Sequence, residues 1–356
     1  MYRQLIATAP RRAELQEYED RAVEPHEVRV RVTAASPKHG SELADFRGQS
    51  PFIDENYDPA WQAFMPRGAG EARGVTFGSW NLGNMWVGRI EETGSQVTEY
   101  AVGDRVCHYG GIRETHIVNA VGNYRLRKLP EGVPWQNAVC YDPAQFALGG
   151  LRDGNVRAGD YVAVIGLGAI GQIAVQLAKR AGAGVVIAVD PIAVRREIAR
   201  RSGADAVLDP GAEDVGLAFK SLTGRLGVDV IIETSGSASA LQASLRGLAY
   251  GGIVSYVAWA KAFPAGLDLG REAHYNYGRL VFSRACSEPN PEYPRWNRRR
   301  IEDTCWKLLT DGTLDCAPII SPVVPFEESA AAYCHYVDQH PEQSIKLGIL
   351  MEEAQP

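Results

Sequence analysis

The stretch from Tyr161 to Asp190 reads YVAVIGLGAIGQIAVQLAKRAGAGVVIAVD, and it decides the fold. It begins with a buried apolar strand, Tyr161 to Ile165, and passes through a glycine-rich turn. A helix follows that carries apolar residues on one face, namely Ile173, Ala174, Leu177 and Ala178. A second apolar strand, Val185 to Val189, ends at Asp190. The sequence therefore predicts two parallel strands joined by a crossover helix.

The three glycines of this turn have separate predicted roles. Gly166 permits the tight turn, Gly168 lets the backbone approach a pyrophosphate, and Gly171 lets the helix pack closely on the strand. The start of the helix then offers free amides for phosphate oxygens, those of Ala169 and Ile170. The turn is therefore expected to bind a dinucleotide.

Asp190 indicates which dinucleotide binds. It follows Gly171 by nineteen residues, where a carboxylate can accept hydrogen bonds from both hydroxyls of the adenosine ribose. A 2′-phosphate would be repelled there, so the sequence favours NAD over NADP. An α/β turn that binds no nucleotide is the alternative, and the joint occurrence of strand, helix, second strand and terminal acid argues against it.

The 356-residue chain has the composition of an ordinary globular protein, with 45% hydrophobic and 22% charged residues. A net charge of −6 argues against nucleic acid or an acidic membrane as a partner. One basic run is interpreted as the solvated start of a helix, namely Arg295, Arg298, Arg299 and Arg300. The six cysteines form no CxxC pair and are read as reduced thiols. With no signal peptide or membrane span in the sequence, the expected location is the cytoplasm.

Two domains are expected. Short alternating strands such as Glu27 to Thr33 and Trp86 to Glu91 predict a β-rich, partly open barrel for residues 1–144. Strands alternating with helices over 145–285 predict a doubly wound parallel sheet, ended by the strand Gly252 to Trp259. Residues 286–356 are expected to return to the first domain.

The first domain contains a long interruption, Gly48 to Gly83, with little periodicity. It is rich in aromatic residues and also holds Arg67, Glu71 and Arg73. Such segments are usually functional or disordered. We expect a substrate lid or a subunit arm.

The order of these parts resembles the medium-chain dehydrogenase/reductase superfamily, the zinc alcohol and polyol dehydrogenases. The resemblance spans nearly the whole chain and rests on HGSELADFRG (39–48), GNMWVGRIEETGSQV (83–97), AVGDRV (101–106), YDPAQFALGGLRDGNVRAGDYVAVIGLGAIG (141–171), AVLDP (206–210) and SIKLGIL (344–350). It implies an α/β fold with a Rossmann-type nucleotide domain and a GroES-like catalytic domain. It also implies a homodimer or homotetramer that pairs sheet edges between subunits.

The match to the family breaks at the catalytic zinc. The family's Cys-Gly-Ser/Thr-Asp motif is His39-Gly40-Ser41-Glu42 here, its Gly-His-Glu motif is Gly83-Asn84-Met85, and its Glu-Pro is Asp142-Pro143. The four-cysteine structural zinc lobe is absent from the sequence. Catalytic zinc requires three protein ligands, and only His39 and Asp142 remain strong donors. We therefore expect no metal. A rearranged site that recruits His108 or His116 is the alternative.

Without zinc, a general base and hydrogen-bond donors must replace the Lewis acid. His39 and Asp142 occupy positions that converge beside the nicotinamide in the family, so they are the predicted acid/base pair. Ser41 matches the family's proton-relay hydroxyl, and Asn84 is a candidate donor to substrate oxygens. Each also has a structural reading, because a histidine can simply be packed, Asp before Pro often starts a helix, and serine often caps a turn.

The resemblance adds further cofactor contacts. Arg195 matches the family's basic residue beside the ribose and adenine. Lys346 matches a basic residue that reaches the pyrophosphate. The turn after Gly251-Gly252 is expected near the nicotinamide, namely Val257, Ala258 and Trp259.

The expected function is NAD-dependent oxidation of a secondary alcohol in a polyol, sugar or cyclitol, or reduction of the matching ketone. Asp142 at the polyol-type position and a lid with charged and aromatic residues favour a polar substrate. Two alternatives stay open. One is a metal-free enone or quinone reductase, a branch that mostly prefers NADPH. The other is a catalytically silent NAD-binding protein.

Overall fold

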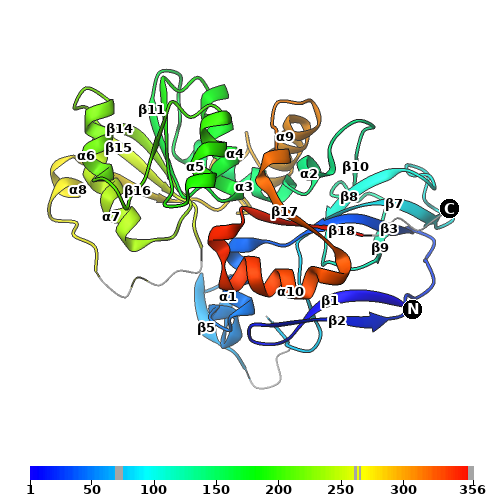
Figure 1. The fold of residues 1–356 in the computed structure, drawn as a ribbon. Helices are drawn as coiled ribbons and strands as arrows, with labels where there is room; N and C mark the ends of the chain where they lie inside the picture. The colour runs from blue at the N-terminus through cyan, green and yellow to red at the C-terminus, as the bar shows by residue number, and fades with distance from the viewer. Residues whose placement is uncertain (69–74, 260–262, 264–265, 352–356) are drawn as a thin grey trace. The chain divides into compact units, whose positions relative to one another are not determined.

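The structure is a computed structural model that describes residues 1–68, 75–259, 263 and 266–351 (Figure 1). The chain divides into two compact units. The β unit comprises Met1–Val139 and the segment from Ile320 onward, and the α/β unit comprises Cys140–Ile319. These boundaries differ from the predicted ones, because residues 140–144 and 286–319 belong to the α/β unit.

The packing of two helices explains this difference. Helix α3 (Tyr141–Asp153) opens the α/β unit, and α9 (Arg298–Thr310) packs against it. The rings of Tyr141 and Trp306 meet edge to face, with their centroids 5.4 Å apart. Residues 286–319 therefore stay with the α/β unit. The predicted basic run lies where α9 begins, as expected of a helix start.

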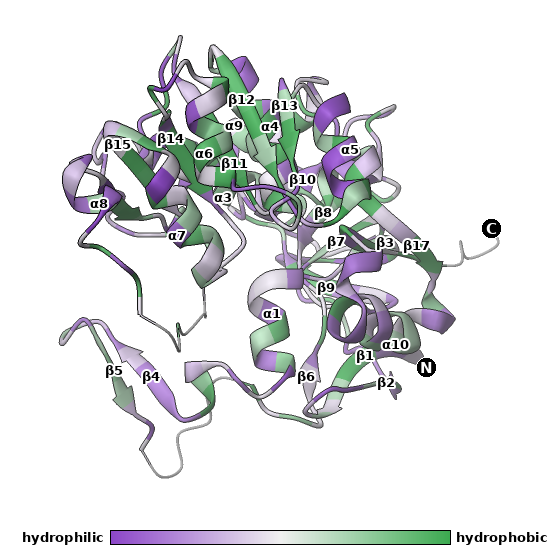
Figure 2. Ribbon diagram, turned by 60° about the vertical axis from the view of Figure 1, so that its left-hand side comes forward, coloured by the Kyte–Doolittle hydropathy of each residue, from purple (hydrophilic) through white to green (hydrophobic). Residues whose placement is uncertain are grey.

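The α/β unit is built on a six-stranded sheet in the order β13-β12-β11-β14-β15-β16, with every neighbouring pair parallel. Figure 2 shows its central strands in hydrophobic colours and α5 in largely hydrophilic ones. The strands are β11 (Tyr161–Ile165), β12 (Val185–Val189), β13 (Ala206–Leu208), β14 (Val228–Glu233), β15 (Leu248–Tyr256) and β16 (Arg279–Phe282). The remaining helices are α4 (Ala169–Arg180), α5 (Ala193–Arg201), α6 (Val215–Leu222), α7 (Ala238–Gly247), α8 (Glu272–Tyr275) and η2 (Ala317–Ile319). The predicted doubly wound parallel sheet is confirmed.

The predicted edge of this sheet was wrong. Strand β15 does not end the sheet, because β16 pairs with it in parallel and lies at the edge. Leu280 and Phe282 of β16 are 40% and 75% exposed. This four-residue strand exposes its apolar side chains. It therefore lacks the longer run of buried apolar residues by which the neighbouring strands are recognised in the sequence.

The β unit contains a seven-stranded sheet, a three-stranded sheet and a hairpin. The large sheet contains β3 (Glu27–Ser36), β7 (Met85–Thr93), β8 (Arg105–Tyr109), β9 (Thr115–Asn119), β10 (Arg127–Lys128), β17 (Ile320–Pro325) and β18 (Lys346–Leu350). The small sheet contains β1 (Tyr2–Ala9), β2 (Arg12–Tyr18) and β6 (Trp80–Asn81). The helical segments are α1 (His39–Phe46), η1 (Pro51–Ile53), α2 (Trp135–Ala138), η3 (Phe326–Glu328), α10 (Ser329–Ala332), the π-helix η4 (Tyr333–Gln339) and η5 (Pro341–Gln343). The predicted β-rich domain is confirmed.

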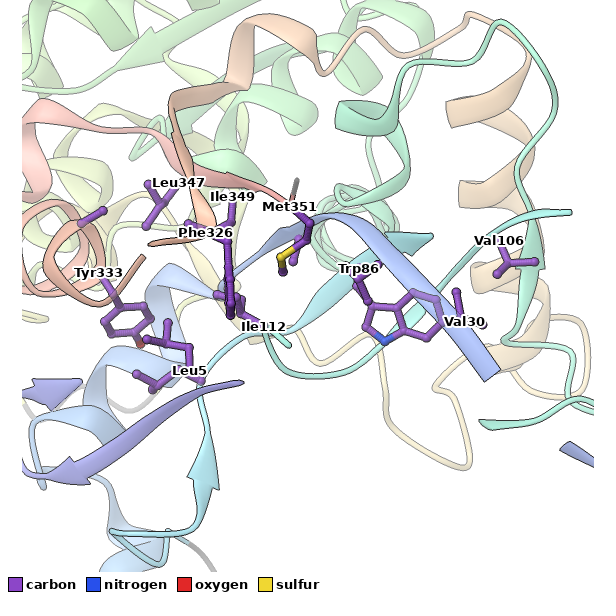
Figure 3. Packing of buried hydrophobic residues seen from close by; sticks show 14 of the residues in the cluster. Leu5, Val30, Trp86, Val106, Ile112, Phe326, Tyr333, Leu347, Ile349 and Met351 are labelled. Atoms are coloured by element: carbon purple, nitrogen blue, oxygen red, sulfur yellow. The ribbon is translucent and has the colours of Figure 1, made fainter. Parts of the chain in front are cut away.

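The C-terminal segment completes this unit. Strand β18 is antiparallel to β3, with Ile349 opposite Ala35. Figure 3 shows Leu347 and Ile349 of β18 in the same hydrophobic core as Phe326 and Trp86. The chain therefore returns to the β unit from Ile320 onward, later than the predicted residue 286.

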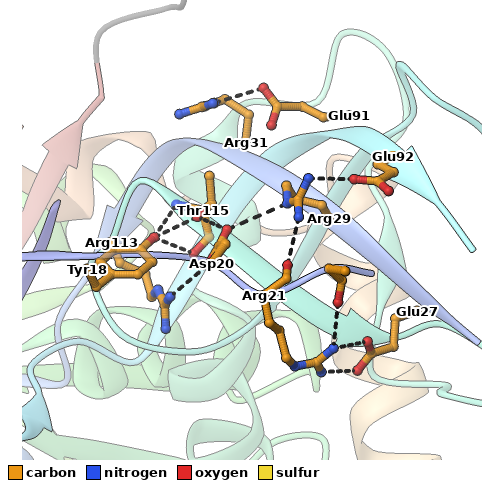
Figure 4. Close-up of polar contacts among 11 residues, drawn as sticks. Tyr18, Asp20, Arg21, Glu27, Arg29, Arg31, Glu91, Glu92, Arg113 and Thr115 are labelled. Atoms are coloured by element: carbon orange, nitrogen blue, oxygen red, sulfur yellow. Dashed lines mark hydrogen bonds and ion pairs between the residues drawn. The ribbon is translucent and has the colours of Figure 1, made fainter. Parts of the chain in front are cut away.

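An ionic network braces one face of the β unit (Figure 4). Asp20 accepts hydrogen bonds from Arg113 at 3.2 Å and from the Thr115 hydroxyl at 2.5 Å. Arg21 binds the Glu27 carboxylate through both of its terminal nitrogens, and this pairing lowers the pKa of Glu27 to about 2. The network fastens the segment after β2 onto β3 and β9.

The predicted lid or arm contains a hairpin formed by β4 (Glu55–Asp58) and β5 (Ala63–Pro66). The Phe64 ring packs against those of Phe52 and Tyr57, at centroid distances of 5.5 and 5.6 Å. Glu71 and Arg73 lie outside the described residues. The role of this segment as lid or arm stays a prediction.

Candidate active site

The glycine turn after β11 has the geometry of a phosphate cradle. Gly166 has a φ of +85°, which favours glycine. A Cβ at Gly171 would lie 1.8 Å from the Gly166 carbonyl oxygen, so only glycine allows this close packing of helix on turn. Gly168 is the N-cap of α4, and a Cβ there would meet nothing within 4 Å. The start of α4, from Ala169 and Ile170, thus faces open space suited to an anion.

The Asp190 carboxylate is fixed at the end of β12. It is 3% exposed, and its Oδ2 accepts a hydrogen bond from Leu167 N at 2.7 Å while Oδ1 accepts one from Ile192 N at 2.8 Å. A terminal nitrogen of Arg195 lies 3.8 Å from Oδ2. A carboxylate has about four lone-pair sites, so Asp190 can hold the glycine turn and still accept from a ribose.

The neighbouring strand ends supply support that sequence reasoning missed. The strand order reverses between β11 and β14, where open parallel sheets bind their ligands. Thr234 follows β14, and its hydroxyl donates to the Gly166 carbonyl at 2.7 Å. The Glu233 carboxylate accepts from the backbone amides of Ser235 and Gly236. The sequence signal that could have indicated these contacts is an acid followed by hydroxyl residues at the end of a strand, ETSG over 233–236.

The residues predicted beside the nicotinamide follow β15. The amides of Val257 and Ala258 donate to the Glu233 carbonyl at 2.8 and 3.3 Å, so this turn is tied to the end of β14. Trp259 is 40% exposed. The turn therefore lies at the same edge of the sheet as the glycine turn.

His39 lies at the first position of α1 in the β unit, and it is half-buried. Its Nε2 accepts a hydrogen bond from the backbone amide of Leu347, at 2.9 Å. A neutral imidazole that accepts through Nε2 carries its proton on Nδ1. This arrangement is at odds with the predicted role of His39 as a general base, since its proton-accepting nitrogen is already engaged.

A buried carboxylate behind His39 was not singled out from the sequence. Glu42 is 7% exposed, and it accepts from the Tyr333 hydroxyl at 2.6 Å and from Gly83 N at 3.1 Å. Burial raises the pKa of Glu42 from 4.5 to about 7, although these two hydrogen bonds and the charge of Lys346 oppose the shift. No local pattern announces this contact, because Glu42 and Tyr333 lie 291 residues apart.

The remaining predicted catalytic residues take different positions. Ser41 is half-buried in the first turn of α1. The Asn84 side-chain nitrogen is buried and has no hydrogen-bond partner. Asp142 is 6% exposed in the first turn of α3, so it belongs to the α/β unit. The pairing of His39 with Asp142 joins the two units and stays a prediction.

Lys346 lies in the β unit, and its predicted contact with the pyrophosphate stays a prediction. It is 3% exposed inside the β unit, and its ammonium donates to the Pro37 carbonyl at 2.6 Å. In this position it supports the turn that precedes α1.

The two histidines considered for a rearranged zinc site have structural roles. His116 stacks on Trp86 at a centroid distance of 4.8 Å, and its Nε2 donates to the Gly111 carbonyl at 2.9 Å. Burial lowers the pKa of His116 to about 3, so the ring is neutral. His108 donates from Nδ1 to the Tyr109 carbonyl at 2.7 Å.

The residues at the family's zinc-ligand positions in this chain do not fit a catalytic zinc. His39 already uses Nε2 to accept a hydrogen bond, and an amide at Asn84 is a poor ligand. Within the described residues, one group of three metal-capable side chains lies close enough to share an ion, namely Glu24, His26 and Glu27. Arg21 already binds Glu27 there.

Among the described residues, no helix is both long enough and apolar enough to cross a membrane.

Comparison with known proteins gives three kinds of match. The family model described as "Zinc-binding dehydrogenase" matches residues 169–291. D-guloside 3-dehydrogenase of Escherichia coli is 64% identical over 347 residues, which cover 98% of this chain and 99% of that protein. Among solved structures, zinc dependent alcohol dehydrogenase 2 from Streptococcus pneumonia has a TM-score of 0.77 at 19% identity, with full coverage of both chains. An alcohol dehydrogenase from Escherichia coli complexed with NADH has a TM-score of 0.74 at 20% identity, covering 98% of this chain and 99% of that one.

Proposed function

This chain belongs to the zinc-binding dehydrogenase family and is an oxidoreductase, and we propose that it uses NAD to oxidise a secondary hydroxyl of a sugar derivative. The substrate that we propose is a D-guloside, oxidised at the hydroxyl of carbon 3. The observation that carries this proposal is the 64% identity to D-guloside 3-dehydrogenase along 98% of the chain. An enzyme of this kind fits the polar sugar substrate expected from the sequence.

The glycine turn and Asp190 would hold the dinucleotide. The amides at the start of α4 would bind the pyrophosphate, and Asp190 would accept from the ribose hydroxyls. When bound, NAD supplies the acceptor for the hydride that leaves carbon 3. A 2′-phosphate would meet the Asp190 charge, which is our reason for preferring NAD to NADP.

The protein must then remove the hydroxyl proton. Oxidation breaks the C–H and O–H bonds of the substrate, and the ketone, a reduced dinucleotide and one proton result. Because Nε2 of His39 is engaged by Leu347, we assign His39 the part of a donor that holds the substrate oxygen through Nδ1. Asp142 is the proposed proton acceptor, Ser41 the relay hydroxyl, and Asn84 a second donor with its buried nitrogen. No step requires zinc.

Three variants of His39 test this assignment. Asparagine places its amide near the position of Nδ1, whereas glutamine places it near Nε2. With an alkyl D-guloside and NAD, we expect His39→Asn to keep part of the turnover that His39→Gln and His39→Ala lose. Equal loss in all three variants would speak for a base, and no NADH formation with any hydroxylated sugar would refute the proposed function.

Cofactor and metal are tested with the unmodified protein. Turnover should be faster with NAD than with NADP, and it should survive a chelator with no stoichiometric zinc in elemental analysis. Reduction of an enone or quinone with NADPH, without sugar oxidation, would instead support the metal-free reductase alternative.

A further inference from the structure

Helix α1, which carries His39 and Ser41, presents its two buried side chains to one tyrosine. Glu42 accepts a hydrogen bond from the Tyr333 hydroxyl at 2.6 Å. Phe46, one turn along, meets the Tyr333 ring edge to face at a centroid distance of 4.8 Å. Tyr333 is fully buried and lies in the core shown in Figure 3. One side chain therefore fixes the inner face of α1.

A second attachment holds the C-terminal end of α1. Arg47, the C-cap residue, donates from Nε to the Asp338 carboxylate at 2.6 Å and from a terminal nitrogen to the Asp338 carbonyl at 2.7 Å. Asp338 is 4% exposed, so this ion pair is largely screened from water. Breaking a buried ion pair leaves an unpaired charge away from water, which is strongly destabilising. This pair therefore opposes movement of the C-terminal end of α1.

The π-helical form of η4 explains how both contacts arise from one short segment. Tyr333 and Asp338 are five residues apart, and in an α-helix the second would point about 140° away from the first. The i→i+5 hydrogen bonding of a π-helix brings residues at this spacing back toward the same side. Figure 1 shows α1 beside the helical segment that continues from α10. Segments of this type frequently occur at functional sites.

The same C-terminal stretch also holds the other end of α1. Lys346 donates to the Pro37 carbonyl at 2.6 Å, and Ser36 donates to the Leu347 carbonyl at 2.7 Å. Leu347 N in turn donates to His39 Nε2. Side chains and backbone groups within residues 333–347 therefore contact α1 at three places: at its C-terminal end, along its buried face and at His39.

We propose that Tyr333, Asp338, Lys346 and Leu347 form a clamp that sets the position of His39, with Tyr333 and Asp338 as positioning residues for the reaction. This rests on the proposed function, in which His39 contacts the substrate. The clamp acts through α1, so neither residue touches substrate. Since a displacement of about 1 Å can cost about 100-fold in rate, small losses in the clamp are measurable.

The test compares Tyr333→Phe and Asp338→Asn with a matched control, Tyr336→Phe, three residues along the same π-helix. Turnover of an alkyl D-guloside is measured with the full chain, together with the dissociation constant of NADH. We expect kcat to fall by about 10- to 100-fold in the first two variants. Tyr336→Phe should keep normal turnover, and NADH affinity should change less than twofold in every variant, because the glycine turn lies in the α/β unit.

A double variant separates positioning from general support of the fold. Where Tyr333 acts through His39, adding Tyr333→Phe to His39→Ala should change kcat by less than about twofold. An equal loss in both backgrounds would overturn the clamp. So would normal turnover in both Tyr333→Phe and Asp338→Asn while His39→Ala is impaired, and that pattern leaves the proposed function standing. If Tyr333→Phe fails to fold, Asp338→Asn in the same two backgrounds decides the question. Full activity of His39→Ala would refute the role of His39 and overturn the clamp with it, whereas the absence of NADH formation by the unmodified protein would refute the proposed function itself.

Discussion

Replacing Glu42 by glutamine should change how the stability of the protein depends on pH. In the unfolded chain this carboxyl ionises near its ordinary pKa of 4.5, whereas burial raises the pKa to about 7 in the folded protein. Between these values the folded protein holds a proton that the unfolded chain has released, so rising pH favours unfolding. Glutamine has a similar shape and no titration.

The magnitude follows from the shift. Each pKa unit corresponds to about 1.4 kcal/mol, so the shift of Glu42 costs the wild type about 3 kcal/mol between low and neutral pH. Relative to Glu42→Gln, the wild type should be most stable below pH 4.5 and should lose this advantage as the pH rises through about 7. Above that, the difference should stay constant.

Urea unfolding of both proteins at several values from pH 5 to pH 8 measures this difference, because the other titrating groups cancel in the comparison. A difference that stays constant over this range would refute the reasoning. Tyr333→Phe offers an independent check. The Tyr333 hydroxyl lowers the pKa of Glu42, so its removal should move the transition to higher pH.

Three further outcomes are expected. Gly171→Ala should abolish NADH binding, because its Cβ would lie 1.8 Å from the Gly166 carbonyl oxygen, whereas Gly168→Ala should fold normally and weaken NADH binding, as measured by fluorescence titration. Asp190→Asn should raise the ratio of kcat/KM for NADP to that for NAD by about tenfold or more, since it removes a charge that repels the 2′-phosphate; an unchanged ratio would contradict this. Phe282→Glu should dissociate the expected homo-oligomer in light scattering, because the exposed strand β16 forms the sheet edge where subunits of such enzymes are expected to pair.

The nucleotide-binding sheet could be predicted closely because its signals are local. Strands β11 and β12 have the predicted bounds, since a buried parallel strand appears in the sequence as a continuous apolar run. Strand β16 was missed because RLVF is short and its side chains are exposed. The second domain boundary was misplaced because α9 packs on α3, a contact between residues far apart in the chain.

The candidate site divides in the same way. The glycine turn and Asp190 follow from spacing within thirty residues, and the structure gives them geometry suited to a dinucleotide. The contact between His39 and Leu347 spans 308 residues, so the sequence could not show which ring nitrogen is engaged. The π-helix η4 has no pattern that distinguishes it from an ordinary helix, and Tyr333 therefore went unnoticed.

The pairing of β18 with β3 affects the order in which the protein gains cofactor binding and catalytic activity during its synthesis. The α/β unit is one continuous stretch, 140–319, and is free to fold while the ribosome is still translating. The amide that engages His39 belongs to Leu347, so it is synthesised only after the whole α/β unit. We expect a chain released after residue 319 to retain NADH in a binding assay yet leave every sugar unoxidised.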